Sequence, residues 1–301
     1  MKIKANGIEI EAEDTGAVAG EDRPVVLLIM GLGMQLIAWP PAFVRALVDA
    51  GYRVIRHDNR DIGLLQHFDH AGLPNLVWTV IKHKLRASIQ PAYKVGDMAL
   101  DAVGVLDALG VDKAHVVGVS MGGMIGQRLC ICAPERALSL TSIMSSSGAR
   151  GLPEASGKVR RALLGRPKSL AVEDIVAHYV HLYKTIGSPA YPIPERDMKL
   201  RIRTALERSF HPAGTMRQMV SIVADTDHRA QALADIRTPT LVLHGRADPL
   251  VPYACGEDTA RRILGAEMVG IEGMGHDLAP GVVDQLLPHL TRFLGAQPRT
   301  A

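Results

Sequence analysis

The chain has 301 residues, of which 47% are hydrophobic and 22% are charged, and its formal net charge is +3. Its length suffices for one large α/β domain, with or without an insertion, and its composition is that of an ordinary globular protein. The small net charge, and the lack of basic runs interleaved with aromatic residues, argue against a nucleic-acid-binding protein. No apolar run approaches the roughly 20 residues that span a membrane, which argues against stable membrane insertion.

The first residues and the cysteines bear on the cellular compartment. Residues 1–16 carry acidic side chains where a signal peptide needs an apolar core, so we expect a cytoplasmic protein. The three cysteines, Cys130, Cys132 and Cys255, are too few for a disulfide framework. We expect them to be small buried core residues rather than metal ligands.

Strands and helices are predicted to alternate along the chain. Lys2–Ala12 predicts a strand that turns at Asn6-Gly7 into a hairpin, since Asn-Gly favours tight turns. Asp97 predicts the cap of a helix that continues to Leu109. Further strands are predicted at 25–30, 52–57, 115–117, 138–144, 240–243 and 267–271, and further helices at 41–50, 124–131 and 281–294. This alternation implies right-handed crossovers and a mostly parallel sheet flanked by helices.

Two stretches interrupt the alternation. Residues 150–230 hold prolines and helical patterns without a buried strand, so we interpret them as a helical cap inserted between core segments 1–149 and 231–301. This stretch has 14 Lys and Arg against 8 Asp and Glu, which predicts either a basic solvated face or a preference for an anionic substrate. Leu64–Tyr93 includes an apolar segment with Trp78, which predicts either a lid helix facing the substrate or a helix packed on the core.

A serine stands where one predicted strand turns into a helix. The short run His115–Val117 is followed by a G-x-S-x-G pattern, Gly118 to Gly122, and then by an apolar helical pattern. In this context the pattern predicts a nucleophile elbow, a tight turn that lifts the Ser120 hydroxyl off the sheet. Such a turn leaves no room for Cβ atoms two positions to either side, which explains the glycines. The alternative is a plain serine N-cap in a glycine-rich turn.

A serine hydroxyl is a poor nucleophile at neutral pH, so Ser120 needs an imidazole to take its proton and a carboxylate to orient that imidazole. Two later segments offer these groups just after predicted strands. Asp248 follows the strand at 240–243, and His276 follows the strand at 267–271 in a glycine-rich loop. Serine, acid, histidine is the chain order expected for an elbow nucleophile.

Four motifs carry a resemblance to a known superfamily. They are the elbow at Ser120, the segment HGRADPLVP around Asp248, the segment GMGHD around His276, and the segment IMGLGMQLIAW that ends at Trp39. Over nearly the whole chain apart from the cap, the sequence resembles the α/β-hydrolase superfamily, and within it the capped esterases of the aclacinomycin methylesterase-like subgroup. Met30 stands where many members have a histidine, a departure that this subgroup tolerates.

The resemblance implies a role for each of these residues. Ser120 would be the nucleophile, His276 the general base and acid, and Asp248 the acidic partner of the histidine. The backbone N–H groups of Leu32 and Met121 would form the oxyanion hole. The resemblance implies neither a metal nor an organic cofactor.

Structural roles are expected for several other polar side chains. Asp277 is expected to be a solvated loop acid, and His244 to brace the loop that follows its strand rather than act as a base. His67, Asp69 and His70 are expected to form a solvated loop rather than a metal site, since no further ligand falls at a usable spacing.

Two acids follow the strand predicted at 52–57. Asp58 and Asp61 are expected to form a hydrogen-bonded turn with Arg56 or Arg60.

Patterns and resemblance together predict a serine esterase that cleaves a small-molecule carboxylic ester through an acyl-enzyme, and they are compatible with a homo-oligomer. The same triad would also serve amide or N-terminal proline release, lactone opening or perhydrolysis. Proline release needs cap carboxylates that hold the substrate ammonium, for which the candidates are Glu173, Asp174, Glu195 and Glu207. An alternative of another class is a receptor with this fold that binds a small ligand and turns over little.

Overall fold

An eight-stranded sheet forms the centre of the molecule, seen here in a computed structural model that describes residues 1–16 and 23–297. The strand order is β1-β2-β4-β3-β5-β6-β7-β8; the first two strands run antiparallel to their neighbours, and the rest are parallel. The strands are β1 (Lys2–Ala5), β2 (Ile8–Asp14), β3 (Val25–Ile29), β4 (Arg53–His57), β5 (Ala114–Val119), β6 (Ala137–Ile143), β7 (Thr240–Gly245) and β8 (Glu267–Ile271). Every strand expected from the sequence is confirmed, and the hairpin turns at Asn6-Gly7 with positive φ at both residues.

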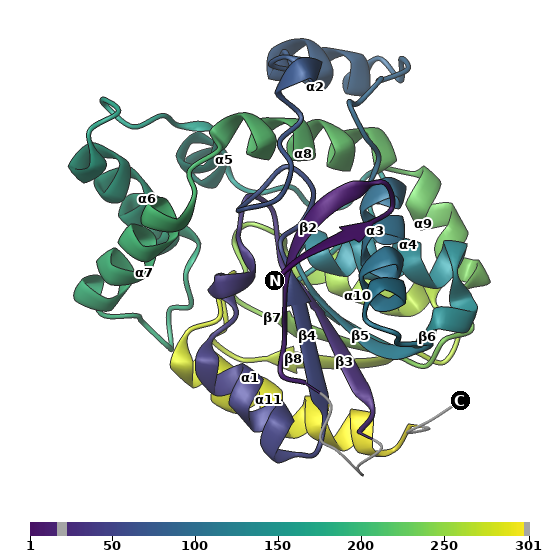
Figure 1. Cartoon of the computed structure of the whole chain (residues 1–301). Helices are drawn as coiled ribbons and strands as arrows, with labels where there is room; N and C mark the ends of the chain where they lie inside the picture. The colour runs from purple at the N-terminus through teal and green to yellow at the C-terminus, as the bar shows by residue number, and fades with distance from the viewer. Residues whose placement is uncertain (17–22, 298–301) are drawn as a thin grey trace.

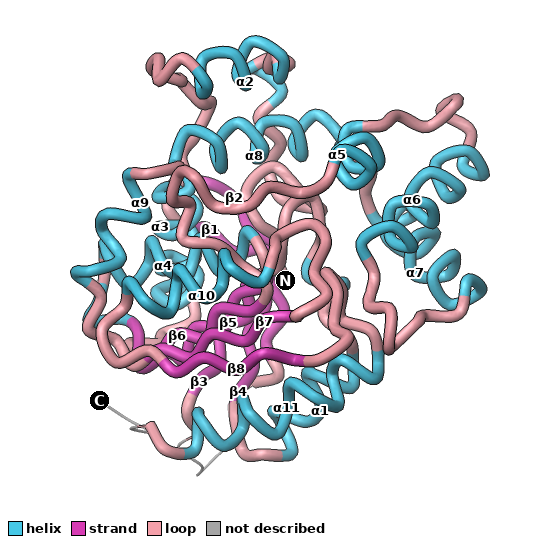
Figure 2. The backbone as a smooth tube through the Cα atoms, turned by 180° about the vertical axis from the view of Figure 1, so that it is seen from behind, coloured by secondary structure: helices cyan, strands magenta, loops and turns pink. Residues whose placement is uncertain are grey.

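Helices cover both faces of this sheet (Figures 1 and 2). The core helices are α1 (Pro41–Asp49), α3 (Val95–Ala108), α4 (Met121–Cys132), α10 (Tyr253–Arg262) and α11 (Pro280–Gly295). Helices α1 and α11 lie on one face, and α3, α4 and α10 lie on the other. Successive residues of β3 therefore enter different cores: Val26 packs with the α1 and α11 side, whereas Leu27 packs with the α3 and α4 side.

Two predictions from the sequence are wrong: the start of α3 and the burial of Cys132. The helix begins at Val95, and Asp97 is its third residue, whose carboxylate accepts from the Lys94 N–H at 2.7 Å instead of capping the helix from outside. Cys130 and Cys255 are buried as expected, but Cys132 is exposed. Residues two apart on a helix point to different faces, so α4 buries only one member of the pair.

The stretch expected to be helical contains α5 (Gly157–Leu164), α6 (Val172–Ile186), α7 (Glu195–Arg208), α8 (Pro212–Asp225) and α9 (His228–Ala232). Helices α6 and α7 pack on each other through a small apolar cluster of their own and stand to one side of the sheet (Figure 1). Helix α8 crosses the molecule and contacts both α3 and α2.

Helix α2 (Leu76–Lys84) lies at the far side of α8 from the sheet, as both views show (Figures 1 and 2). It contacts α8, and Thr79 is its buried residue. Trp78 points to solvent and belongs to neither core cluster. No helix among the described residues is long and apolar enough to cross a membrane.

Candidate active site

Ser120 occupies the sharp turn between β5 and α4. Its backbone has φ 55° and ψ −118°, a conformation that non-glycine residues rarely adopt. The strand and helix on either side maintain it: the Ser120 N–H donates to the Ile143 carbonyl at 2.9 Å, and the Ser120 carbonyl accepts from the Ser145 hydroxyl at 2.7 Å. Ser120 is half-buried, so the turn presents its hydroxyl at the carboxyl edge of the sheet.

The glycines around Ser120 are needed because three backbone segments meet there. A Cβ atom on Gly118 would overlap the carbonyl of Gly122, and one on Gly122 would overlap the carbonyl of Ile29 in β3. The G-x-S-x-G spacing is therefore a packing requirement of the elbow, as the sequence predicted.

His276 connects the serine with a buried carboxylate. Its Nε2 lies 3.1 Å from Ser120 Oγ, and its Nδ1 lies 2.7 Å from Asp248 Oδ2. Asp248 is fixed by its other oxygen, which accepts the backbone N–H groups of Leu250 and Val251 at 2.9 and 2.8 Å. The loops after β5, β7 and β8 thus bring together three side chains that are far apart in the sequence. This arrangement can deprotonate a hydroxyl while a carboxylate stabilises the imidazolium.

His244 braces the acid loop, as expected. Its Nε2 donates to the Val251 carbonyl at 2.8 Å and lies 3.7 Å from Asp248 Oδ2. Burial lowers the pKa of His244, which disfavours an imidazolium at this position beside Asp248.

The loop after β3 lies directly against Ser120. A Cβ atom on Gly31 would be 3.3 Å from the Ser120 Cβ. Within the described residues, the N–H groups of Leu32 and Met121, which the resemblance assigns to the oxyanion hole, have no protein acceptor. Leu32 is half-buried, whereas Met121 is fully buried.

Side chains from other elements fix the shape of this loop. Asn59 Nδ2 donates to the Met30 carbonyl at 2.6 Å, and the Gly33 N–H donates to Gln218 Oε1 of α8 at 2.9 Å. Gly33 has φ +67°, and a Cβ atom there would lie 2.7 Å from the Thr215 hydroxyl. Neither Asn59 nor Gln218 belongs to a motif, so no pattern in the sequence indicated their roles.

Asp277 is not the solvated acid that the sequence suggested. Its carboxylate accepts from the Ser188 hydroxyl at 2.6 Å and from the Ser188 N–H at 3.0 Å, and the same hydroxyl accepts the Gly275 N–H at 2.8 Å. The His276 N–H donates to the carbonyl of Ile186, the last residue of α6, at 2.7 Å. The histidine loop is therefore fastened to the end of α6, a contact that no local pattern could predict.

The expectation for Asp58 and Asp61 is wrong in its partners. Asp58 pairs with Arg208 of α7 at 2.8 Å, and Asp61 forms a two-bond pair with Arg217 of α8. Both carboxylates are fully buried, and they bind arginines of α7 and α8 rather than Arg56 or Arg60. Arg56 pairs with Glu13 instead, and Arg60 pairs with Asp101.

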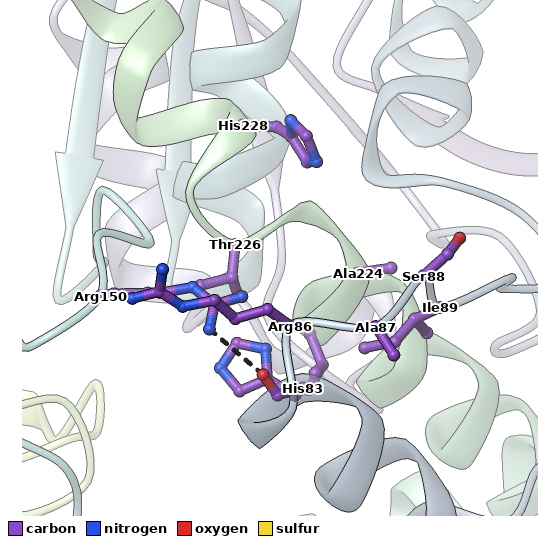
Figure 3. Close-up of a pocket in the computed structure, with 10 residues that line it drawn as sticks. His83, Arg86, Ala87, Ser88, Ile89, Arg150, Ala224, Thr226 and His228 are labelled. Carbon is purple, nitrogen blue, oxygen red and sulfur yellow. Dashed lines mark hydrogen bonds between the residues drawn. The ribbon is translucent and has the colours of Figure 1, made fainter.

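Two hollows lie near the C-terminal ends of α2 and α8, one of about 300 Å³ (Figure 3) and one of about 390 Å³. Ser120, Asp248 and His276 line neither of them. His83 and Arg150 line both hollows.

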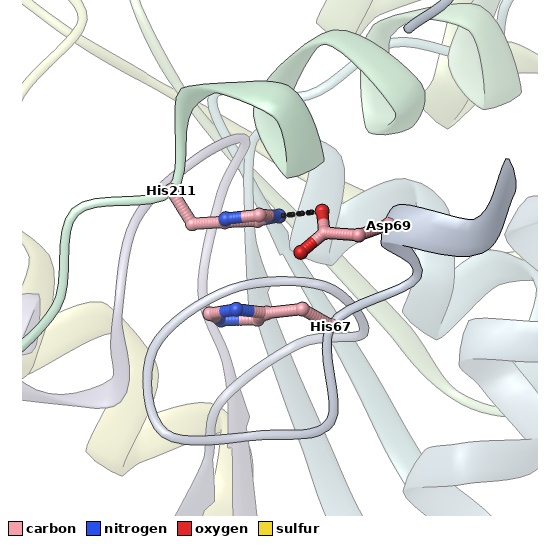
Figure 4. A group of neighbouring side chains, drawn as sticks. All are labelled: His67, Asp69 and His211. Carbon is pink, nitrogen blue, oxygen red and sulfur yellow. Dashed lines mark ion pairs between the residues drawn. The ribbon is translucent and has the colours of Figure 1, made fainter. Parts of the chain in front are cut away.

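His67, Asp69 and His211 come together near α8 (Figure 4). Asp69 and His70 are exposed, as expected for a solvated loop, whereas His67 is half-buried. The rings of His67 and His211 are stacked 3.8 Å apart at 7° to each other. A ligating imidazole holds its metal in the ring plane, so two parallel rings cannot direct lone pairs at one ion. The Arg217 guanidinium also donates to His211 Nε2 at 3.0 Å. As placed, these residues do not fit a metal site.

Comparisons with known proteins agree with this fold. The model of the alpha/beta hydrolase family matches residues 26–285. Rhodomycin D methylesterase DauP of Streptomyces sp. (strain C5) is 32% identical over 88% of both chains, and the putative carbamate hydrolase RutD of Variovorax paradoxus (strain S110) is 30% identical over 79% of both. The enol-lactonase of Burkholderia xenovorans LB400 shares the fold, with a TM-score of 0.73 at 20% identity, covering 98% of this chain and all of that one. With most of its length matched by the family model and by these relatives, the chain is a hydrolase of the alpha/beta hydrolase family.

Proposed function

We propose that this hydrolase cleaves carboxylic esters through an acyl-enzyme on Ser120, with Asp248 and His276 completing the triad. The observation that carries the proposal is the position of His276, within hydrogen-bond distance of both Ser120 Oγ and Asp248 Oδ2. The methylesterase names of DauP and of DnrP from Streptomyces peucetius, 31% identical over 88% of both chains, support an ester substrate.

In the proposed reaction, His276 Nε2 takes the hydroxyl proton as Ser120 Oγ attacks the acyl carbon. The N–H groups of Leu32 and Met121 stabilise the tetrahedral oxyanion, each contributing about a hundredfold to a thousandfold in rate. His276 then protonates the departing alcohol, and a water molecule activated by the same imidazole releases the acid and restores the serine.

We also propose that residues 150–230 act as a cap over core segments 1–149 and 231–301. The buried ion pairs from Asp58 to Arg208 and from Asp61 to Arg217 support a cap that is fixed firmly to the core. The free thiols of the three cysteines are consistent with a cytoplasmic location.

Two of the four candidate acids are already paired with cations, which argues against release of an N-terminal proline. Glu173 is paired with Arg203, and Glu195 with both Lys184 and Lys199. Carboxylates that are already neutralised by cations are poor partners for a substrate ammonium, so ester cleavage is favoured over aminopeptidase action.

The test is Ser120→Ala, assayed on methyl esters and on p-nitrophenyl esters of graded acyl length. Loss of the nucleophile should lower kcat on the order of a millionfold, with an unchanged unfolding midpoint. Ser169→Ala, an exposed serine in the loop before α6, serves as the matched control and should keep full activity.

Ester turnover that persists in Ser120→Ala would refute the assignment. Rapid labelling of Ser120 by a fluorophosphonate, with negligible turnover across the ester panel, would instead favour a ligand-binding receptor.

A further inference from the structure

Helix α2 presents its apolar side to solvent. Six large apolar side chains on the helix and just beside it are each between 38% and 72% exposed. They are Leu73, Val77, Trp78, Val80, Ile81 and Leu85, and we call them the α2 surface. Six exposed large apolar side chains within thirteen residues are unusual on a free protein and mark an interaction site.

The packing of α2 explains why this side faces outward. The helix packs on α8, Thr79 is its buried residue, and Leu76 and His83 are half-buried. Its short polar residue therefore points inward and its aromatic and branched residues outward, the reverse of an ordinary surface helix. Helix α2 also projects beyond α8 at one end of the molecule (Figure 1), where a flat partner can reach it.

Positive charge surrounds the α2 surface. Residues 70–94 contain Lys82, Lys84, Arg86 and Lys94 and no Asp or Glu. The hollow behind the helix adds the guanidinium of Arg150, beside the imidazoles of His83 and His228 (Figure 3). Nearby acids are Asp227, which pairs with Arg150, and Glu154, which pairs with Arg160 and lines the second hollow.

We propose that the α2 surface docks on the surface of a lipid bilayer that carries anionic headgroups. A short helix with an exposed apolar face, a tryptophan and neighbouring lysine and arginine side chains matches the physics of interfacial helices. The apolar side chains enter the boundary between headgroups and acyl chains, and Trp78 lies at headgroup level. Lys84 and Arg86 meet the negative lipid charge, which strengthens binding to anionic surfaces.

The charge pattern favours lipid over a second copy of this chain. In a two-fold contact through α2, both copies would bring the lysine and arginine side chains of residues 70–94 into one interface without an acidic residue there to pair with them, which opposes that contact. Closure of α2 over its own chain is disfavoured as well, since the contact of Thr79 with α8 would have to break before the apolar side could turn inward.

The fluorescence of Trp78 can report binding of the α2 surface to lipid. It has two tryptophans, of which Trp39 is fully buried and Trp78 is 53% exposed. Vesicles of phosphatidylcholine mixed with phosphatidylglycerol should shift Trp78 emission to the blue, protect it from iodide, and pellet the protein on centrifugation. Vesicles of phosphatidylcholine alone should do so much less, and added salt should release the protein.

Two paired variants test the two parts of the surface. Lys84→Glu combined with Arg86→Glu should weaken vesicle partitioning by at least about tenfold, whereas Arg166→Glu with Lys168→Glu, the same change of charge in the loop before α6, should leave it unchanged. Val77→Ser combined with Ile81→Ser should also abolish the emission shift, whereas Leu170→Ser with Leu264→Ser, at exposed sites elsewhere, should not.

The proposal fails if anionic vesicles neither pellet the protein nor shift its emission, or if the reversed-charge pair binds as well as its control. A dimer seen by light scattering and lost in Val77→Ser with Ile81→Ser would show that a second copy of the chain, and not lipid, covers the α2 surface. A blue shift of Trp78 emission produced by a dissolved ester without vesicles would indicate that α2 closes over its own chain, and it would refute docking on lipid. Binding needs no turnover, so these outcomes are independent of the proposed esterase activity.

Discussion

The amide of Gln218 is fully buried and bonded at both ends. Its Oε1 accepts the Gly33 N–H at 2.9 Å, and its Nε2 donates to the Arg60 carbonyl at 2.8 Å. Since Gly33 follows the proposed oxyanion donor Leu32, this side chain of α8 sets the direction of the Leu32 N–H. Gln218 is a positioning residue, because it acts through the loop rather than on the substrate.

Gln218→Met should therefore lower kcat by about tenfold or more and leave KM nearly unchanged, since a misdirected donor weakens transition-state binding above all. Steady-state kinetics on one ester measure the split. Gln127→Met is the matched control: Gln127 is equally buried, but its Oε1 accepts from Arg229, away from the loop. Equal losses of kcat in both variants would reduce Gln218 to a general packing role.

The residues that stand in motifs were predictable from the sequence, whereas the residues that only position a loop were not. Ser120, Asp248 and His276 stand in recognisable motifs at strand ends, so their meeting could be predicted. Gln218 touches a residue 185 positions away, and nothing near it in the sequence marks that contact. Hydrogen bonds between distant loops depend on the final packing of helices, which no local pattern contains.

At the scale of elements, the junction of β5 and α4 is the tightest point of the fold. Gly118→Ala should destabilise the protein by about 3 kcal/mol or more, because its methyl group would overlap the backbone of Gly122 and the elbow would have to open. Gly96→Ala in α3 meets nothing within 4 Å and should be neutral or stabilising by up to about 1 kcal/mol. Urea unfolding of the two variants measures both; similar midpoints would contradict the packing account.

Strands that are buried on both faces were predictable from the sequence. Val25–Ile29 and Ala114–Val119 are buried along their whole length, and their continuous apolar runs indicated this. Helix α2 was not predictable in the same way, because apolar residues occur on most of its sides. Only its contact with α8 decides that Thr79 is inside and Trp78 outside.

At the scale of the whole molecule, buried histidines contribute to the response to acid, and His57 and His115 show the largest shifts. Burial lowers the pKa of both His57 and His115 from 6.5 to about 4, so each is neutral in the folded protein. Between these pH values the unfolded chain binds protons at both sites and the folded chain does not. The free energy of unfolding therefore falls as the pH drops from 6.5 to about 4, and it is independent of these groups above 6.5.

The loss should approach about 3 kcal/mol for each histidine at the acid end of this window. His115→Gln keeps a polar partner for Ser139 without the titration, so it should flatten the slope of stability against pH. Urea unfolding from pH 7 to pH 4.5 measures the slope, with the exposed His181→Gln as control. An unchanged slope in His115→Gln would contradict the assignment.

Carboxylates act at lower pH. Burial alone would raise the pKa of Asp61, but hydrogen bonds from Arg217 and from the Phe68 N–H outweigh it and lower the pKa. The stabilisation from this pair is complete above the ordinary carboxylate pKa and is lost only as the pH falls below it. As the pH falls, stability is therefore lost through the buried histidines before the ion pair between Asp61 and Arg217 weakens.

Ser188 and Asp277 have a consequence for anyone who wishes to re-engineer this protein. The imidazole that would move the proton is tethered to the last turn of α6, so remodelling that helix to admit a new substrate also displaces the base. A change in the end of α6 would therefore also move the proposed base. A graft of foreign helices would stay active only if it carried its own substitute for the Ser188 tether.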